Sequence, residues 1–154
     1  MTMIFTEHMK ICPMTKDELL KKIDLTTDKD EREAYKEMLA GGENNPVDEW
    51  VWNVPWKMVY DRNNEEIGSL GFRGAPENHA VEVGYGIEKS YEGKGLMTEA
   101  VGAILEWAFE QKDVLVVEAE AAPENKASQR ILEKLHFVRN GMGEEGYRFK
   151  LEKK

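Results

Sequence analysis

The sequence predicts an α+β fold with a mixed β-sheet. Three observations predict it: short strand-like segments between residues 56 and 87, one strongly periodic helix over residues 96–111, and a β-branched segment directly after that helix. Strands that precede and follow a strand-turn-helix-strand unit are typical of a sheet with helices packed against it. The sequence shows no internal repeat and no low-complexity segment that would favour another architecture.

The length and composition fit one domain over residues 1–154. The chain has 41% hydrophobic and 33% charged residues, which is enough for one core. Its apolar segments are all shorter than the ~20 residues of a membrane span. Residues 1–10 also lack the apolar stretch of a signal peptide. We therefore expect a cytoplasmic protein with no membrane partner.

Cysteine and histidine offer no predicted metal site. Cys12 is the one cysteine, which excludes an internal disulfide, and His8, His79 and His136 are far apart in the sequence. The net charge of −9 argues against a nucleic-acid partner, because binding to phosphates needs clustered Lys and Arg. Cationic small molecules or peptides are easier partners, although an acidic surface is more often a solubility feature.

The first elements are a strand and a helix. Residues 9–13 suit a short strand. Thr15 and Glu18 then form a capping box, in which each side chain satisfies a free backbone donor. A helix is therefore expected to follow through residue 23.

A second helix is predicted after Thr27, which supplies its N-cap. Glycine often ends a helix because it adopts positive φ, so Gly41 and Gly42 are expected to end this one. Residues 42–47 are then a loop. The apolar face of the helix carries Ala34, Tyr35, Met38 and Leu39.

Three strands are predicted in the middle of the chain. They cover residues 56–61, 67–73 and 80–87, and turns at residues 62–64 and 74–78 join them. Turns this short connect neighbouring antiparallel strands, so the three strands form a meander.

The second half of the chain predicts helix, strand, helix and strand. Residues 96–111 form the clearest helix, and a β-branched run at residues 114–117 predicts a buried strand. A helix over residues 125–135 and a last strand over residues 146–151 follow. The apolar residues with helical spacing in the first of these helices are Met97, Val101, Ile104, Leu105 and Ala108.

The turn that joins the meander to the strongest helix contains Gly93, Lys94 and Gly95. Backbone N–H groups at a helix N-terminus lack intrahelical partners, and the helix dipole is positive there, so this turn is suited to an anion. Glycine lets the anion approach closely, and Lys94 would add a charge. The pattern alone is not specific, because a glycine pair also serves a tight strand-to-helix turn.

Two better-known phosphate motifs do not fit this turn. A Walker A loop would need glycine in place of Glu88 and Ser or Thr in place of Gly95. The dinucleotide fingerprint would need a small residue in place of Thr98. Nucleotide-binding interpretations lose support accordingly.

Residues 81–137 resemble the acetyl-CoA-binding core of the GNAT superfamily of N-acetyltransferases. In that family a strand leads through Gln/Arg-x-x-Gly-x-Gly/Ala into a helix. Residues 90–95 stand at this motif, and Ser90 departs from its first position. An Asn-x-x-Ala/Ser helix that ends near Gly-Phe follows in the family. Asn125, Ser128 and Phe137 match it, and His136 replaces the usual glycine. The pattern is most similar to the branch of ribosomal-protein N-terminal acetyltransferases, the RimJ/RimL type.

The resemblance implies a three-layer fold whose central mixed, mostly antiparallel sheet is splayed in the middle and flanked by helices. It implies an acceptor side over residues 1–60 and a core over residues 80–137 that binds acetyl-CoA as co-substrate, without a metal. The turn would bind the pyrophosphate, and the strand before it would pair with the pantetheine arm. The implied acetyl-CoA-binding residues are Tyr85, Gly86, Ile87, Glu92, Gly93, Lys94, Gly95, Leu96, Met97, Asn125 and Ser128.

Acyl transfer to an amine needs a base for the ammonium proton and a donor for the departing thiolate. Glu82 is the first candidate for the base, although Glu118 and Glu120 are rivals and a strand glutamate is often merely solvated. Many family members place a tyrosine on the last helix as acid, but Leu132 stands there. Ser128 and Asn125 remain as hydrogen-bonding groups near the expected sulfur. Ser128 is therefore the candidate donor, and a water held by the two side chains is the alternative.

Trp50 and Trp52 are predicted to bind the acceptor amine, together with Glu82. They lie beside Asp48 and Glu49, and an aromatic wall with carboxylates would suit a cation. The alternative, that each tryptophan fills the core, stays open.

We therefore expect an N-acetyltransferase in which an amine attacks acetyl-CoA directly. The acceptor is either a small molecule or a peptide N-terminus, and the protein is a monomer or homodimer. One alternative is a non-catalytic acyl-CoA-binding or regulatory domain, which the missing tyrosine supports. Another is a flavodoxin-like or other phosphate-binding domain.

Overall fold

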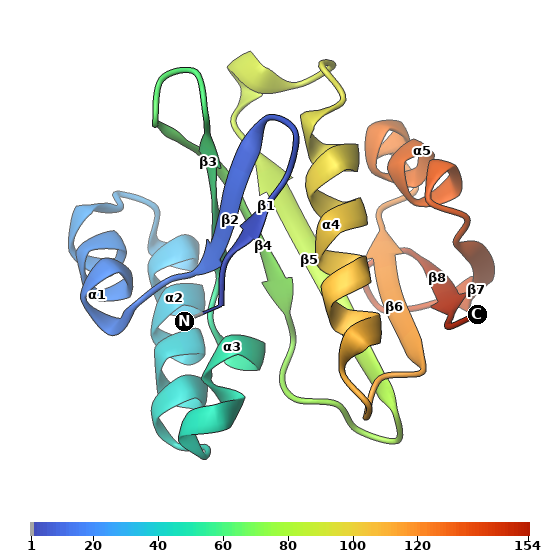
Figure 1. Ribbon diagram of the computed structural model, residues 1–154, viewed down its shortest axis with the longest axis horizontal. Helices are drawn as coiled ribbons and strands as arrows, with labels where there is room; N and C mark the ends of the chain where they lie inside the picture. The colour runs from blue at the N-terminus through green and yellow to red at the C-terminus, as the bar shows by residue number, and fades with distance from the viewer. Residues whose placement is uncertain (1) are drawn as a thin grey trace.

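A computed structural model describes residues 2–154, which form eight strands and five α-helices (Figure 1). The strands are β1 (Ile4–Phe5), β2 (Met9–Pro13), β3 (Trp56–Tyr60), β4 (Glu66–Phe72), β5 (Ala80–Ile87), β6 (Val116–Ala121), β7 (Val138–Met142) and β8 (Tyr147–Glu152). The helices are α1 (Lys16–Leu25), α2 (Lys29–Glu43), α3 (Trp50–Asn53), α4 (Leu96–Glu110) and α5 (Lys126–Lys134). Two 3₁₀ turns, η1 (Val47–Glu49) and η2 (Lys89–Tyr91), precede α3 and α4.

The strands form one mixed sheet in the order β1-β2-β3-β4-β5-β6-β8-β7. Within residues 2–154, β5 and β6 form the parallel pair, and every other neighbouring pair is antiparallel. The predicted meander corresponds to β3, β4 and β5. The predicted α+β class, with a mixed and mostly antiparallel sheet, is confirmed.

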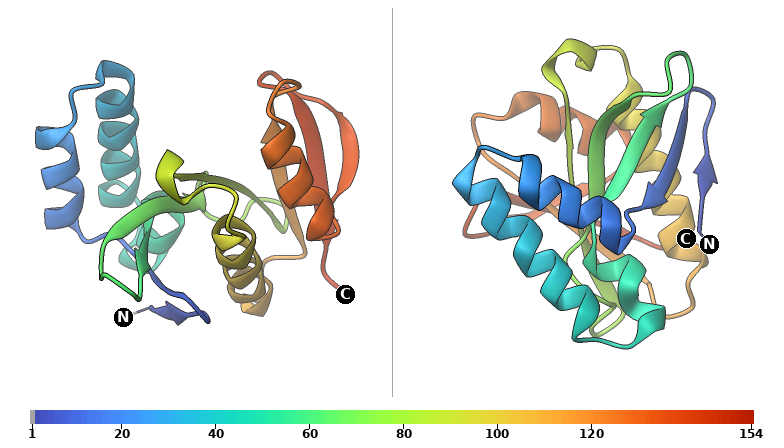
Figure 2. Two further views of the ribbon diagram at one scale, coloured as in Figure 1. Left: turned by 90° about the horizontal axis from the view of Figure 1, so that it is seen from above. Right: turned by 90° about the vertical axis from the view of Figure 1, so that its left-hand side faces the viewer.

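Helices cover both faces of the sheet. The left view of Figure 2 shows α1 and α2 on one face and α4 on the other, with β6, β8 and α5 to one side. Helix α4 is the central helix of the core, because its apolar stripe faces the sheet. The buried residues of α4 are Leu96, Met97, Ala100, Val101, Ile104, Leu105 and Ala108. In residues 2–154, no helix has the length and apolar character needed to span a bilayer.

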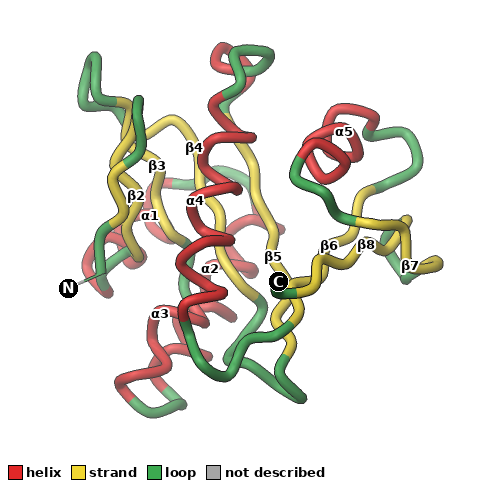
Figure 3. Tube along the Cα trace, turned by 45° about the vertical axis from the view of Figure 1, so that its right-hand side comes forward, coloured by secondary structure: helices red, strands yellow, loops and turns green. Residues whose placement is uncertain are grey.

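The parallel pair β5–β6 is joined over only part of its length. Ala80, Val81 and Glu82 of β5 pair with Val116, Val117 and Glu118 of β6, and no pair follows. Residues 83–87 of β5 pair with β4 alone. Figure 3 shows the two strands meeting at one end and separating toward the other. We call this separation the fork; it is the splay that the family resemblance implies.

The first two helices confirm one predicted cap and correct another. Thr15 and Glu18 form the capping box of α1. The N-cap of α2 is Asp28 rather than Thr27, because the Asp28 side chain accepts from two free backbone N–H groups. The predicted helix end at Gly41-Gly42 is wrong, since α2 continues to Glu43.

Close packing explains the glycine at position 42. A Cβ on Gly42 would lie 2.6 Å from the Trp50 ring, so a side chain there would collide with α3. This glycine therefore allows two helices to approach each other, and it does not serve as a cap.

The structure shifts or adds three strands. The strand predicted at 114–117 is β6, which starts at Val116 and runs to Ala121. Strands β1 and β7 were not predicted. The first has two residues, and every residue of the second is exposed, so neither carries the alternating pattern of a half-buried strand. The last predicted strand corresponds to β8.

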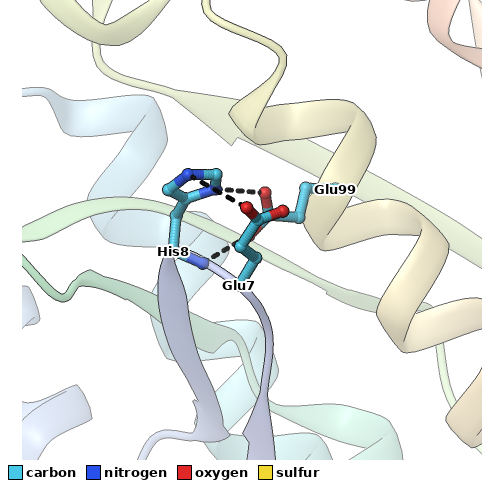
Figure 4. Close-up of side chains that lie close together, drawn as sticks. All are labelled: Glu7, His8 and Glu99. Carbon is cyan, nitrogen blue, oxygen red and sulfur yellow. Dashed lines mark hydrogen bonds and ion pairs between the residues drawn. The ribbon is translucent and has the colours of Figure 1, made fainter.

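A polar tie fastens the β1–β2 turn to the first turn of α4. One Glu99 carboxylate oxygen accepts from the Thr6 hydroxyl at 2.6 Å and from the His8 backbone N–H at 2.9 Å. The other oxygen lies 2.7 Å from His8 Nδ1. Figure 4 shows the side chains of His8 and Glu99 pointing toward each other, with Glu7 beside them.

Glu7, His8 and Glu99 are the three groups in residues 2–154 that are close enough to share a metal ion. Because both oxygens of Glu99 already have hydrogen-bond partners, we assign the cluster a structural role.

The tie shifts the ionisation of both partners. The hydrogen bond with Glu99 raises the pKa of His8. Burial would raise the pKa of Glu99, but hydrogen bonds from Thr6 and His8 outweigh it and lower that pKa. The His8 contribution to stability is full below its unfolded pKa of about 6.5 and is lost as the pH rises through the raised folded value. The Glu99 contribution is full above about 4.5 and is lost as the pH falls through the lowered folded value.

Replacing Glu99 with glutamine removes the charge of the tie and keeps the size of the side chain. We expect Glu99→Gln to lower the melting temperature most between about pH 4.5 and 6.5, where both groups are charged in the folded state. Thermal unfolding of both proteins across this range and beyond it measures the difference. Glu106→Gln, an exposed position of the same helix, is the control and should change little. A Glu99→Gln effect of constant size at every pH contradicts the assignment.

Candidate active site

A cavity of about 390 Å³ lies between β5, the turn into α4, and α5. Strand β5 and helix α5 lie on the two sides of the fork, and the turn into α4 lies at its open end. The lining residues are Tyr85, Gly86, Ile87, Tyr91, Glu92, Gly93, Gly95, Leu96, Met97, Thr98, Asn125, Ala127, Ser128, Arg130, Ile131 and Lys134. Every residue predicted to bind acetyl-CoA, except Lys94, lines this cavity.

The turn before α4 presents bare backbone to the cavity. Gly93 and Gly95 have φ of 77° and 78°, the left-handed region that glycine adopts without strain. A Cβ on either glycine would meet nothing within 4 Å, so the space beside the turn is open. No side chain caps α4 at Gly95. The first N–H groups of the helix therefore point toward the cavity without a partner, which suits an anion.

Tyr91 holds this turn against the β3–β4 turn. Its hydroxyl accepts from Asn63 at 2.9 Å, and its ring packs edge-on against Tyr60 with centroids 5.5 Å apart. The Nζ of Lys94 lies 5.4 Å from the centroid of the same ring. Tyr91 lines the cavity and Lys94 does not, so the predicted contact of Lys94 with the pyrophosphate stays a prediction.

Positive charge comes instead from α5. Arg130 and Lys134 both line the cavity, and they are four residues apart on one face of the helix. The sequence prediction missed them. Their spacing places two basic residues on one face of the last predicted helix. Only the packing of that helix shows that this face meets the glycine turn.

Two hydroxyl groups meet across the cavity. Tyr85 of β5 places its hydroxyl 2.8 Å from Ser128 Oγ of α5 and 3.3 Å from the Ser128 carbonyl oxygen. Asn125 caps α5 by accepting from the Ser128 backbone N–H at 3.1 Å. Leu132 is fully buried and offers no proton.

A second hollow, of about 530 Å³, lies around Glu82. Side chains alternate along β5, so Glu82 faces the side opposite to Tyr85. A Cβ on Gly84 would meet nothing within 4 Å, which leaves open space next to Glu82. The residues around this hollow are Arg73, Glu82, Glu120, Met142, Gly143, Glu144, Glu145 and Arg148.

Glu82 lies at the point where β5 and β6 separate. Burial raises the pKa of its carboxyl group, and the charge of Arg73 partly opposes this shift. Arg73 Nε is 3.2 Å from Glu82, and the same guanidinium reaches Glu145 at 3.1 Å. A carboxylate with a raised pKa in a hollow is suited to accept a proton.

The rival glutamates, Glu118 and Glu120, share one arginine. Arg148 lies 3.1 Å from Glu118 and 3.1 Å from Glu120. The second oxygen of Glu120 accepts from the Glu145 backbone N–H at 3.0 Å. Both oxygens of Glu120 are thus occupied, and Glu118 does not line the hollow, so Glu82 is the more available base.

The tryptophans predicted at the acceptor site pack elsewhere. Trp52 is 7% exposed, and its ring lies 4.8 Å from the Phe72 ring and 4.9 Å from the Trp107 ring. Trp50 donates from Nε1 to the Met14 carbonyl at 3.0 Å and packs against α2. Core packing thus accounts for both rings, and neither lines the hollow around Glu82.

Comparison with known proteins gives one family. The family model described as "Acetyltransferase (GNAT) domain" matches residues 7–138. An uncharacterized N-acetyltransferase of Bacillus subtilis, YjdG, is 37% identical over 86 residues, which cover 55% of this chain and 51% of that protein. The [ribosomal protein uS5]-alanine N-acetyltransferase of Escherichia coli is 33% identical over 86 residues, covering 54% and 44%. The chain thus spans about half the length of these relatives.

A solved structure shares the fold over the whole chain. RimL, a ribosomal L7/L12 α-N-protein acetyltransferase in complex with coenzyme A, has a TM-score of 0.74 at 15% identity. The match covers 98% of each chain.

Proposed function

The chain belongs to the acetyltransferase (GNAT) family, and we propose that it transfers the acetyl group of acetyl-CoA to a primary amine by direct attack. The observation that carries this proposal is the cavity in which the free N–H groups of α4 meet the unpaired edge of β5. The coenzyme A complex of the structurally similar RimL supports the choice of ligand.

In this proposal the cavity binds acetyl-CoA as a co-substrate, without a metal. The backbone from Glu92 to Met97 binds the pyrophosphate, and Arg130 and Lys134 add positive charge on the facing helix. The pantetheine arm lies along Tyr85, Gly86 and Ile87, where β5 has no partner on the β6 side. Asn125 and Ser128 are then near the sulfur.

The fork connects the two sides of the sheet. Because no pair joins β5 to β6 beyond Glu82, a thioester held on the Tyr85 side can be reached from the Glu82 side. We propose that Glu82 removes the ammonium proton, directly or through water, and that a backbone N–H near Tyr85 binds the oxyanion. Ser128 donates to the departing thiolate.

The acceptor enters from the hollow around Glu82. Four glutamates and two arginines line it, so a cationic amine is favoured. A small molecule or a protein N-terminus both fit this description, and the name of the Escherichia coli relative is consistent with the latter. We further propose a cytoplasmic monomer or homodimer with no nucleic-acid or membrane partner, in accord with the net charge of −9.

A substitution at the glycine turn tests cofactor binding. Gly95 has φ of 78°, so Gly95→Ala is expected to shift the turn by making that conformation cost about 1–2 kcal/mol. Affinity for coenzyme A should fall roughly tenfold by calorimetry. Gly74→Ala is the matched control, because Gly74 has φ of 98° and equally open surroundings but lies outside the cavity. Equal affinity in the two variants contradicts the predicted pyrophosphate site.

Acetyl-CoA turnover with a panel of amines tests the reaction and the base together. The panel contains polyamines, amino acids, aminoglycosides and peptides with free N-termini, and release of the CoA thiol and the mass of the product are measured. Wild type should acetylate at least one class. Glu82→Gln should lose about 10²- to 10⁴-fold in kcat and should still bind acetyl-CoA.

The pH profile identifies the base. Only the carboxylate form of Glu82 accepts a proton, so wild-type activity should fall as the pH drops through its raised pKa. That acidic limb should disappear in Glu82→Gln and persist in the control Glu118→Gln. An unchanged profile in Glu82→Gln removes Glu82 as the base. Binding of acetyl-CoA without turnover of any amine favours the non-catalytic alternative.

A further inference from the structure

One polar contact connects the two sides of the fork inside the cavity. Within residues 2–154, the side-chain hydrogen bonds between β5 and α5 join the Tyr85 hydroxyl to Ser128. The contact to Ser128 Oγ, at 2.8 Å, is shorter than the contact to the carbonyl, at 3.3 Å. When Tyr85 donates to Ser128 Oγ, the proton of the Ser128 hydroxyl is free to point into the cavity.

The other hydroxyls of the cavity are less suited to donate a proton. The Tyr91 hydroxyl is held by Asn63 at 2.9 Å, on the side of the β3–β4 turn. Thr98 belongs to the first turn of α4, beside the proposed pyrophosphate site. Leu132 is apolar and fully buried. Ser128 is thus the donor nearest the proposed sulfur position, and Tyr85 is its partner.

Tyr85 is suited to support a donor. Burial raises the pKa of its phenol, and the hydrogen bond with Ser128 opposes this only in part, so the phenol keeps its proton at neutral pH. Its ring is partly buried and packs against the core, which fixes the hydroxyl in place. A serine alone would be free to rotate among its three rotamers.

We propose that Tyr85 is a positioning residue, which orients the Ser128 hydroxyl toward the departing thiolate and returns a proton to Ser128 Oγ afterwards. This inference rests on the proposed acetyl transfer. As the C–S bond of the tetrahedral adduct breaks, its electron pair stays on sulfur, and sulfur takes the proton of Ser128. Ser128 Oγ takes the phenolic proton of Tyr85, and the phenolate regains a proton from water. The nitrogen loses two protons, one to Glu82 before the attack and one from the adduct as it becomes an amide. One of them replaces, through water, the proton that Tyr85 has passed on, and the other is released to solvent, so the products are an amide, a thiol and one proton.

A double-mutant cycle tests this arrangement. The proteins are wild type, Tyr85→Phe, Ser128→Ala and the double variant, and the rate of CoA thiol release is measured in a single turnover with enzyme in excess. We expect Ser128→Ala to lose roughly 10²-fold and Tyr85→Phe about 10-fold. The double variant should be no slower than Ser128→Ala, because Tyr85 acts through Ser128. Affinity for coenzyme A should stay within about twofold throughout.

Controls separate this role from packing and from failure of the proposed function. Tyr35→Phe removes a half-buried hydroxyl from α2, away from the cavity, and should leave the rate unchanged. If wild type releases no thiol, the proposed function fails and the inference fails with it. If wild type is active and Tyr85→Phe matches it, only the inference fails. Additive losses in the double variant, or a loss explained by weaker coenzyme A binding, overturn it as well.

Discussion

Strands β5 and β6 pair over three residues and then separate, and the arrangement of the site depends on this separation. It leaves one edge of β5 without a partner, next to the exposed N–H groups of α4. It also places Glu82 at the last paired position, where it faces the side of the sheet opposite to Tyr85. A fully paired sheet would close the route between the cofactor cavity and the hollow around Glu82.

The elements around the fork are held by contacts from distant parts of the chain. The tie from His8 and Thr6 to Glu99 fixes the first turn of α4, and Tyr91 fixes the preceding turn against Asn63. The free N–H groups are therefore positioned before any anion binds, which lowers the cost of ordering the site. On the acceptor side, Arg73 joins Glu82 to Glu145 and so holds the β7–β8 loop near the proposed base.

The features predicted correctly are local ones. Thr15 and Glu18, and the glycine turn before α4, can be read from a few neighbouring residues because caps and positive φ are set by short-range chemistry. One error is local, because the N-cap of α2 is Asp28 rather than its neighbour Thr27. Other errors come from tertiary packing. The sequence cannot show that Gly42 is needed for packing against Trp50. Arg130 and Lys134 were missed for the same reason, since the packing of α5 decides which of its faces meets the turn. The fold class was predictable because the order of strands and helices limits the topology.

A structure of the complex with coenzyme A would show whether the fork binds the cofactor. We predict that the fork persists with its pairing ending at Glu82, that the pyrophosphate contacts backbone N–H groups between Glu92 and Met97, and that the pantetheine amides pair with β5 between Val83 and Ile87. Coenzyme A bound outside the fork, or a fork closed by further pairing of β5 with β6, would contradict it.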